Sequence, residues 1–140
     1  MRHLSRARAF ALAVPVVAAA VVWSVAQAGT GGGRVVSITE RDFRISAPAW
    51  IHAGTVRLRI HNLGPDTHEL LIVRAPTGRL PLRADGLTVD EEEIHSSVFE
   101  GQERGKTGEL RVRLAPGRYV LLCNMAGHYL AGMRRTILVR

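Results

Sequence analysis

The chain has one cysteine in 140 residues, and the residues that follow it limit what the chain can fold into and bind. Cys123 is followed by His128 five positions later and by Met133 five positions after that. A thiolate, an imidazole and a thioether can therefore converge from a single loop. Soft sulfur ligands together with imidazole suit copper, which proteins hold in a trigonal site of two histidines and one cysteine with a weak axial methionine. Three of those four ligands lie in this loop.

The second histidine of such a site has to come from another segment, and His68 is the best candidate. It follows the turn residues Gly64 and Pro65 and opens an apolar run, 70–73, that predicts a buried strand. A ligand at the start of a buried strand would be held rigidly. The other histidines, by contrast, have no partner at a ligand spacing, and we expect none of them to bind the functional metal; they are His3, His52, His61 and His95.

Residues 1–28 have the pattern of a secretory signal. Three arginines in the first eight residues precede an apolar run, 9–22, and Ala26-Gln27-Ala28 forms a small-residue cleavage site before Gly29. A glycine-rich tether, 29–33, would then lead into one domain, 34–140. The alternative is an uncleaved membrane tether, because the run 9–25 approaches the ~20 residues that a transmembrane helix needs. The prediction is an exported protein, periplasmic or extracellular, or anchored to the outer face of the cytoplasmic membrane.

A lone thiol in an exported chain makes a metal the simplest reason for the cysteine. One cysteine cannot form an internal disulfide, and a free thiol in an oxidising compartment is a liability unless something occupies it. The alternative is a small buried residue that packs as a hydrophobe. The histidine and methionine partners of Cys123 favour copper.

The charge of the chain argues against nucleic acid as a partner. The whole sequence has a formal charge of +7, and removing 1–28 takes away three of the 19 basic residues and none of the 12 acidic ones, which leaves +4. These basic residues are scattered through predicted strands and are not clustered with aromatic side chains, as a nucleic-acid surface requires.

Short alternating segments separated by turn residues predict an all-β fold. The predicted strands are 34–38, 42–45, 55–61, 67–73, 109–114, 118–123 and 136–139. Such a pattern favours an antiparallel Greek-key β-sandwich. Strand 118–123 is apolar on both faces and should be central, which places Cys123 at the end of a buried strand.

The segment 74–106 gives no clear pattern. Pro76, Gly78, Pro81 and Gly86 interrupt it, and the acidic run 90–93 is expected to be a solvated loop without a chemical role. Trp50 and Ile51, which precede strand 55–61, are expected to cover the core.

Three spacings together resemble the cupredoxin, or blue type 1 copper, family. They are Asn62-x-Gly64-x3-His68, Gly117-x-Tyr119-x3-Cys123 and Cys123-x4-His128-x4-Met133. The loop spacing is similar to that of rusticyanin, sulfocyanin and auracyanin, and longer than that of plastocyanin. One departure is Glu69, which stands where many cupredoxins have an asparagine that ties the two ligand loops together.

The ligand set and the resemblance imply a mononuclear Cu(II)/Cu(I) site of His68, Cys123, His128 and Met133. A monomeric one-electron carrier is expected, with redox proteins docking near His128 because cupredoxins expose the corresponding histidine edge. An enzyme is not expected: multicopper oxidases flank the blue-site cysteine with histidines, where this chain has Leu122 and Asn124, and the dinuclear copper site of oxidase subunits needs two cysteines. The alternative is an extracytoplasmic protein for copper storage, delivery or tolerance.

Overall fold

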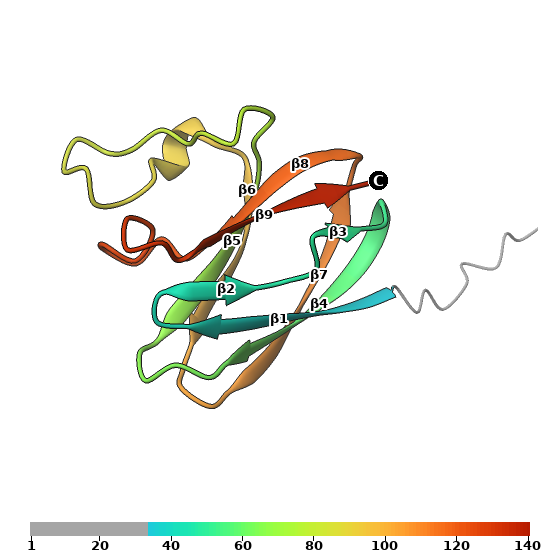
Figure 1. Cartoon of the computed structure of the whole chain (residues 1–140), viewed down its shortest axis with the longest axis horizontal. Helices are drawn as coiled ribbons and strands as arrows, with labels where there is room; N and C mark the ends of the chain where they lie inside the picture. Colours follow the sequence, from blue (N-terminus) through green and yellow to red (C-terminus); the bar gives the residue numbers. More distant parts are fainter. Residues whose placement is uncertain (1–33) are drawn as a thin grey trace, which may run out of the picture. The chain divides into compact units, whose positions relative to one another are not determined.

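The computed structural model describes residues 34–140, and the predicted signal, tether and cleavage site lie outside the described residues. Two β-sheets pack face to face (Figure 1). The first has the order β2-β1-β4-β7, formed by Arg44–Ser46, Arg34–Arg41, Gly54–Asn62 and Thr107–Leu114. The second has the order β3-β9-β8-β5-β6, formed by Trp50–Ile51, Arg134–Val139, Gly117–Leu122, His68–Arg74 and Ser96–Gln102. The all-β sandwich predicted from the sequence is confirmed.

The core between the sheets follows from the alternation of apolar residues along the strands. In β4, Val56, Leu58 and Ile60 are buried, whereas Arg57 and Arg59 point outward into solvent. Burying one such aliphatic side chain stabilises the fold by roughly 1.5–3 kcal/mol. Cys123 and Met133 belong to the same buried cluster, so the predicted metal ligands rest directly on the core.

The pairing of the strands differs from the prediction in two places. The predicted sandwich is antiparallel, but β1 pairs with β4 in parallel and β3 pairs with β9 in parallel. Side-chain alternation is the same in both kinds of ladder, so it cannot tell them apart. Residues 50 and 51 form β3, in which Ile51 is buried and Trp50 is 42% exposed. Of this pair, only Ile51 covers the core as expected.

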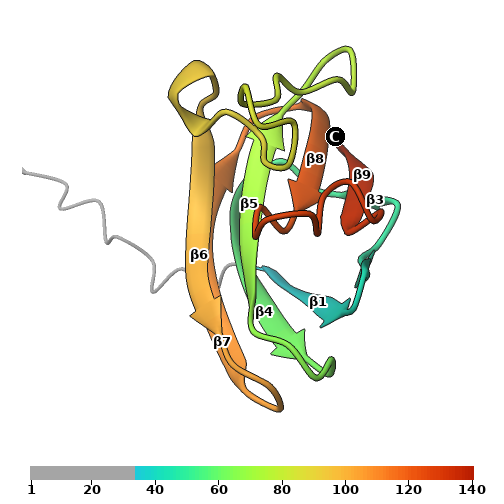
Figure 2. The ribbon, with the colours of Figure 1, turned by 90° about the vertical axis from the view of Figure 1, so that its left-hand side faces the viewer.

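The outer faces of the two sheets are treated differently. The segment after β5 and the loop after β8 cover the outer face of the second sheet over β5 and β8 (Figures 1 and 2). Val89 and Tyr129 from these segments pack there against a second buried cluster that includes Leu71, Val120 and Leu122. Strand β8 is the middle strand of five and is covered on both sides, as predicted. The first sheet has no such second cluster among residues 34–140.

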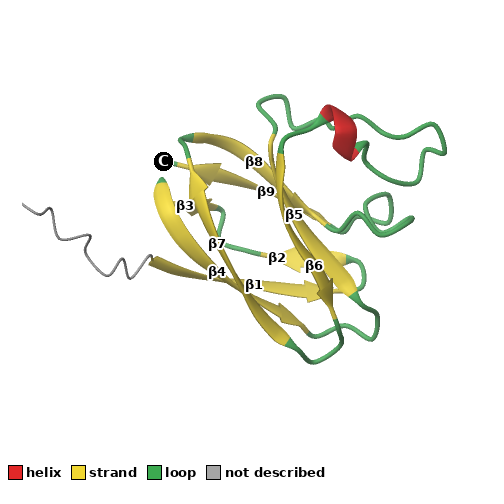
Figure 3. Ribbon diagram, turned by 180° about the vertical axis from the view of Figure 1, so that it is seen from behind, coloured by secondary structure: helices red, strands yellow, loops and turns green. Residues whose placement is uncertain are grey.

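Two elements lie in the segment that the sequence left unassigned. Strand β6 runs along β5, and a single 3₁₀ turn, η1 (Glu91–Glu93), is drawn as the one helix in Figure 3. In residues 34–140, no helix has the length and apolar character needed to span a bilayer. Strand 42–45 is also shorter than predicted, because Asp42 and Phe43 form the turn between β1 and β2.

Candidate metal centre

Cys123 directly follows β8 and is completely buried. Its backbone N–H donates a hydrogen bond of 3.1 Å to the carbonyl of Met133, and the N–H of Met133 donates one of 3.0 Å to the carbonyl of His128. Further turns close the loop on itself, such as the 2.9 Å bond from the His128 N–H to the Met125 carbonyl. The loop therefore has a defined backbone before any metal binds.

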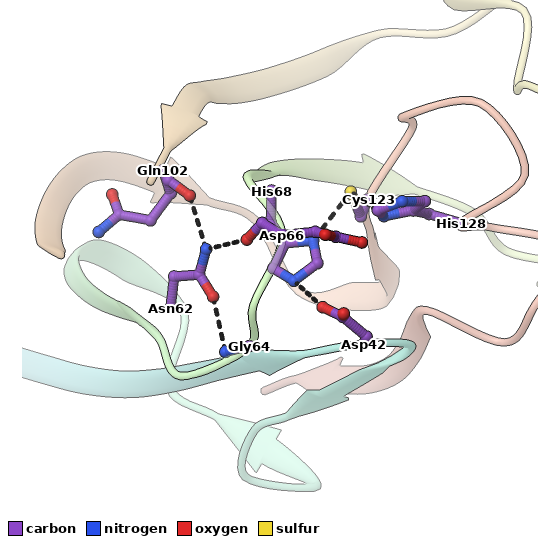
Figure 4. Close-up of polar contacts among 8 residues, drawn as sticks. All are labelled: Asp42, Asn62, Gly64, Asp66, His68, Gln102, Cys123 and His128. Atoms are coloured by element: carbon purple, nitrogen blue, oxygen red, sulfur yellow. Dashed lines mark hydrogen bonds and ion pairs between the residues drawn. The ribbon is translucent and has the colours of Figure 1, made fainter. Parts of the chain in front are cut away.

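His68 is the first residue of β5 and is also completely buried. Its Nδ1 atom lies 3.9 Å from the Cys123 sulfur, and its Nε2 atom lies 2.8 Å from Oδ1 of Asp42 (Figure 4). A carboxylate on the far nitrogen of a histidine fixes the ring and leaves the near nitrogen free to bind a metal. The sequence did not identify Asp42, because its position inside a predicted strand gave no signal of this role.

His128 approaches the same sulfur from the other side. Its Nδ1 atom lies 3.5 Å from the Cys123 sulfur, and the ring centroids of His68 and His128 are 5.3 Å apart. The ligand atoms of His68, Cys123 and His128 all lie within 4.8 Å of one another. Unlike His68, the ring of His128 is only partly buried, and it meets Phe43 edge to face at 5.0 Å. Three of the four predicted ligands therefore converge.

Met133 lies next to this group through its backbone. Its side chain is completely buried in the core, and its main chain is hydrogen-bonded to both Cys123 and His128. The assignment of its thioether as the axial ligand is part of the proposal made below. Of the remaining histidines in 34–140, His61 lies 2.9 Å from the hydroxyl of Thr107 and His52 packs against Trp50.

The turn that delivers His68 is fixed by Asn62. Its Nδ2 atom donates bonds of 2.7 Å to the carbonyls of Asp66 and Gln102, and its Oδ1 atom accepts one of 2.9 Å from the N–H of Gly64 (Figure 4). Gly64 needs to be glycine, since a Cβ there would lie 2.5 Å from Oδ1 of Asp42 and 3.0 Å from Nε2 of His68. The Asn-x-Gly spacing seen in the sequence thus has a direct structural cause.

Glu69 takes part in joining the two ligand segments. The backbone N–H of Asn124 hydrogen-bonds to its carboxylate and lowers its pKa, although burial has the larger effect and raises it. The backbone N–H of Glu69 in turn bonds to the Cys123 sulfur. Glu69, which stands where many cupredoxins have an asparagine, therefore still connects the segment of His68 with the segment of Cys123.

Asn124 fastens the metal loop to the segment after β5. Its Oδ1 atom accepts a 2.6 Å bond from the N–H of Val89, and its Nδ2 atom donates to the carbonyl of Val89 at 3.0 Å and to Oε1 of Glu91 at 2.7 Å. The N–H of Gly127 also donates to the carbonyl of Leu87 at 3.2 Å. The acidic run, expected to be a solvated loop, forms η1 and supplies Glu91 to this contact.

The electrostatics of the site fit a cation. Burial raises the pKa of the Cys123 thiol above its usual value, opposed by hydrogen bonds from the backbone N–H groups of Glu69 and Met125. Burial likewise lowers the pKa of His68, opposed by Asp42, and thus favours the neutral imidazole that ligates metals. A bound cation would favour loss of the thiol proton. A thiolate beside two imidazoles suits copper.

No family model and no curated protein matches the sequence. Solved structures match the fold. Dithionite-reduced auracyanin from Roseiflexus castenholzii is 20% identical, with 79% of this chain and 99% of that chain covered and a TM-score of 0.57. Auracyanin A, a "blue" copper protein from Chloroflexus aurantiacus, is 20% identical, with 78% and 100% covered and a TM-score of 0.57. Rusticyanin from Thiobacillus ferrooxidans is 16% identical, with 77% and 79% covered and a TM-score of 0.57.

The fold and the site agree with each other. At these identities the likeness concerns the fold, while the convergence of His68, Cys123 and His128 is a property of this chain itself. The chain therefore has the cupredoxin fold, and in it the ligand atoms of His68, Cys123 and His128 lie within 4.8 Å of one another.

Proposed function

We propose that this protein is an exported blue-copper protein that carries one electron at a time. Copper bound by His68, Cys123, His128 and Met133 would supply the Cu(II)/Cu(I) couple. The single observation that carries the proposal is the convergence of the ligand atoms of His68, Cys123 and His128 within 4.8 Å of one another. Because the ligands are already gathered, little of the protein has to move when the electron arrives or leaves. That property suits a carrier.

The residues around the site divide the work between them. Asp42 and Asn62 hold His68 in place, and the backbone N–H groups of Glu69 and Met125 stabilise the thiolate. Burial of Cys123 excludes water from the sulfur. These features favour a closed site over one with a free position for a substrate, so we propose a carrier and not an enzyme.

The decisive test is titration of the purified apo protein with Cu(II), followed by visible spectroscopy. We expect one equivalent of copper to give an intense thiolate-to-copper absorption that one-electron reductants bleach reversibly. Cys123→Ser should abolish this absorption. Met125→Leu is the matched control for sulfur, because Met125 is 39% exposed and should leave the spectrum unchanged. A blue Cys123→Ser protein would refute the site.

We also propose that redox partners dock around the exposed edge of His128. Phe43, Met125 and Leu130 are large apolar side chains and are 43%, 39% and 48% exposed, and a group of exposed apolar side chains can mark an interaction site. Tyr129, which follows His128 in the loop, is buried and is not part of this patch, and the Arg134 guanidinium lies 4.7 Å above its ring. A small apolar patch suits a transient interface of less than about 1,200 Å².

Leu130→Glu tests this docking surface. It should slow electron exchange with a physiological partner while leaving the visible spectrum intact. Leu138→Glu is the matched control, because Leu138 is 46% exposed and lies in β9 away from the metal loop. Equal rates for the two variants would show that electrons enter and leave through another surface. Slower copper transfer to an apo acceptor, with unchanged electron exchange, would favour the delivery function.

Export, the monomeric state and the Greek-key connections remain predictions. The N-terminus of the protein recovered from its native compartment can be read by mass spectrometry. We expect a mature start at Gly29, and an intact 1–28 segment in the membrane fraction would establish the tether.

A further inference from the structure

The outer face of the first sheet carries a dense set of arginines. Strand register places six of them on this face, which we call the arginine face: Arg41, Arg44, Arg57, Arg59, Arg111 and Arg113. All six are exposed, and the neighbouring residues on the same strands point into the core. Glu109 is the one acidic residue on these four strands that shares this face.

Two pairs on the arginine face set like charges directly opposite each other. Arg57 is the cross-strand partner of Arg111, and Arg41 is the partner of Arg44. Like charges in this position destabilise a sheet. Glu109 offsets only part of the repulsion, since its carboxylate lies 3.0 Å from Nη2 of Arg59 and 3.6 Å from Nε of Arg57. Within 34–140, Arg41, Arg44, Arg111 and Arg113 form no salt bridge.

The charge of the described chain is concentrated on this one surface. Residues 34–140 contain 16 basic and 12 acidic side chains. Six of the basic side chains and one of the acidic side chains lie on the arginine face. The rest of residues 34–140 thus has ten basic and 11 acidic side chains, one of which is the buried Glu40, and is close to neutral. The outer face of the second sheet, in contrast, is covered by the chain's own loops. A strongly cationic face on a nearly neutral body points to an anionic partner.

We propose that the arginine face binds the surface of an anionic phospholipid bilayer. Guanidinium groups bind phosphate in a bidentate manner, and a bilayer offers many mobile phosphates to a broad face at once. A protein interface usually has an apolar or aromatic centre. Here the one large apolar side chain exposed on the face is Val35, which pairs with Arg57.

The position of β1 supports the same partner. It belongs to the first sheet and begins at Arg34, and eight residues, 26–33, separate it from the end of the apolar run 9–25. Eight extended residues span at most about 29 Å. If the run stays in the membrane, the arginine face therefore starts within reach of the phosphates; if it is cleaved, the same charges still provide a reversible attachment. His128, which follows β8 in the other sheet, stays free for redox partners.

The test compares two bilayers and reads each arginine separately. The protein with its native N-terminus is placed with nanodiscs of phosphatidylcholine alone or of phosphatidylcholine mixed with phosphatidylglycerol. Phenylglyoxal labelling is then measured by mass spectrometry. On the anionic discs, we expect labelling of Arg57, Arg59, Arg111 and Arg113 to fall at least about fivefold, since each arginine near such a surface gains about 1 kcal/mol. Labelling should recover at 1 M salt, where the Debye length is about 3 Å.

A matched pair of variants separates this surface from general charge. Arg57→Gln with Arg111→Gln removes one repulsive pair, so it should not lower the melting temperature, but it should weaken protection of Arg59 and Arg113. Arg79→Gln with Arg104→Gln makes the same change of charge in two exposed loop residues and should leave protection intact. Equal labelling on the two bilayers, or equal losses in the two variants, would overturn the proposal. So would protection by soluble polyglutamate without protection by the bilayer, which would assign the face to an acidic protein.

Discussion

The two histidines of the site contact the same sulfur from opposite environments. His68 is buried, starts a central pair of strands and has Asp42 2.8 Å from its far nitrogen. His128 is partly exposed, lies in a loop and has its ring edge to face with the exposed ring of Phe43. The inner ligand is held by polar groups of the scaffold, while the outer one faces the surface. The buried imidazole of His68 therefore fixes the geometry of the site, and the partly exposed imidazole of His128 gives access to it from the surface.

The largest expected effect comes from removing each imidazole in turn. His68→Ala should cost about 2–4 kcal/mol of apo-protein stability, because it leaves a cavity and removes the partner of the Asp42 carboxylate. His128→Ala should cost under about 1 kcal/mol. Urea unfolding measures both. Added imidazole should restore the blue colour with Cu(II) only in His128→Ala, whose gap opens to solvent. Rescue of His68→Ala alone would reverse the roles of the two histidines.

The next-largest effect concerns Glu40, a buried acid in β1 that lies opposite Asn62 of β4. Both of its carboxylate oxygens lack hydrogen-bond partners, and burial, assisted by the charge of Glu69, raises its pKa from 4.5 to about 7. The folded protein thus holds a proton that the unfolded chain releases. The stabilisation is complete below pH 4.5 and is lost as the pH rises to about 7.

Glu40→Gln should remove this dependence on pH. The variant should match the wild type below pH 4.5 and exceed it by about 3 kcal/mol above pH 7, at 1.36 kcal/mol for each pKa unit. Urea unfolding of both apo proteins across this range provides the measurement. A constant difference at every pH would mean that Glu40 does not change its protonation on unfolding.

A smaller effect is expected for the carboxylate that orients His68. Asp42→Asn should lower copper affinity about 10- to 100-fold at neutral pH, as loss of such an orienting group does in other metal sites. Asp42 raises the pKa of His68, so protons should compete with copper only at a lower pH in the variant. Competition with a copper chelator across pH tests both effects. Glu103→Gln is the control, because it removes an exposed negative charge that is not among the groups that shift the pKa of His68.

The smallest effect should come from the other buried ligand. Met133→Leu keeps the volume of the core, so it should cost less than about 1.5 kcal/mol. It should keep the blue colour and shift the reduction potential upward, because a donor that favours Cu(II) is lost. Voltammetry and absorption spectra of the two proteins provide the comparison. A colourless variant would show that the thioether is essential.

The parts of the molecule visible in the sequence are those with strong local patterns. The alternation in β4 and β7 and the continuous apolar run of β8 led to the sandwich, and the spacing of residues 123–133 led to ligands that converge. Strand β6 escaped notice because it lies at the edge of its sheet and most of its residues are only half buried, so no alternation marks it.

Polar partners that are distant in the sequence could not be predicted from it either. Asp42, Glu40 and Gln102 reach the surroundings of His68 from two different strands and a turn, and no spacing along the chain connects them. Glu91 bonds to the metal loop 33 residues away in sequence. Such contacts depend on how the sheets are ordered, which local periodicity does not determine.

The hydrogen bonds of Asn124 and Gly127 bear on how far this metal loop can be treated as a transplantable module. Residues 123–133 contain three of the proposed ligands, yet the Asn124 side chain also bonds to Val89 and Glu91, and the Gly127 N–H bonds to Leu87, all in the segment after β5. A graft of the loop alone onto another sandwich would leave these polar groups without partners. The metal loop and the 87–91 segment would therefore have to be transferred together, whether by evolution or by an engineer.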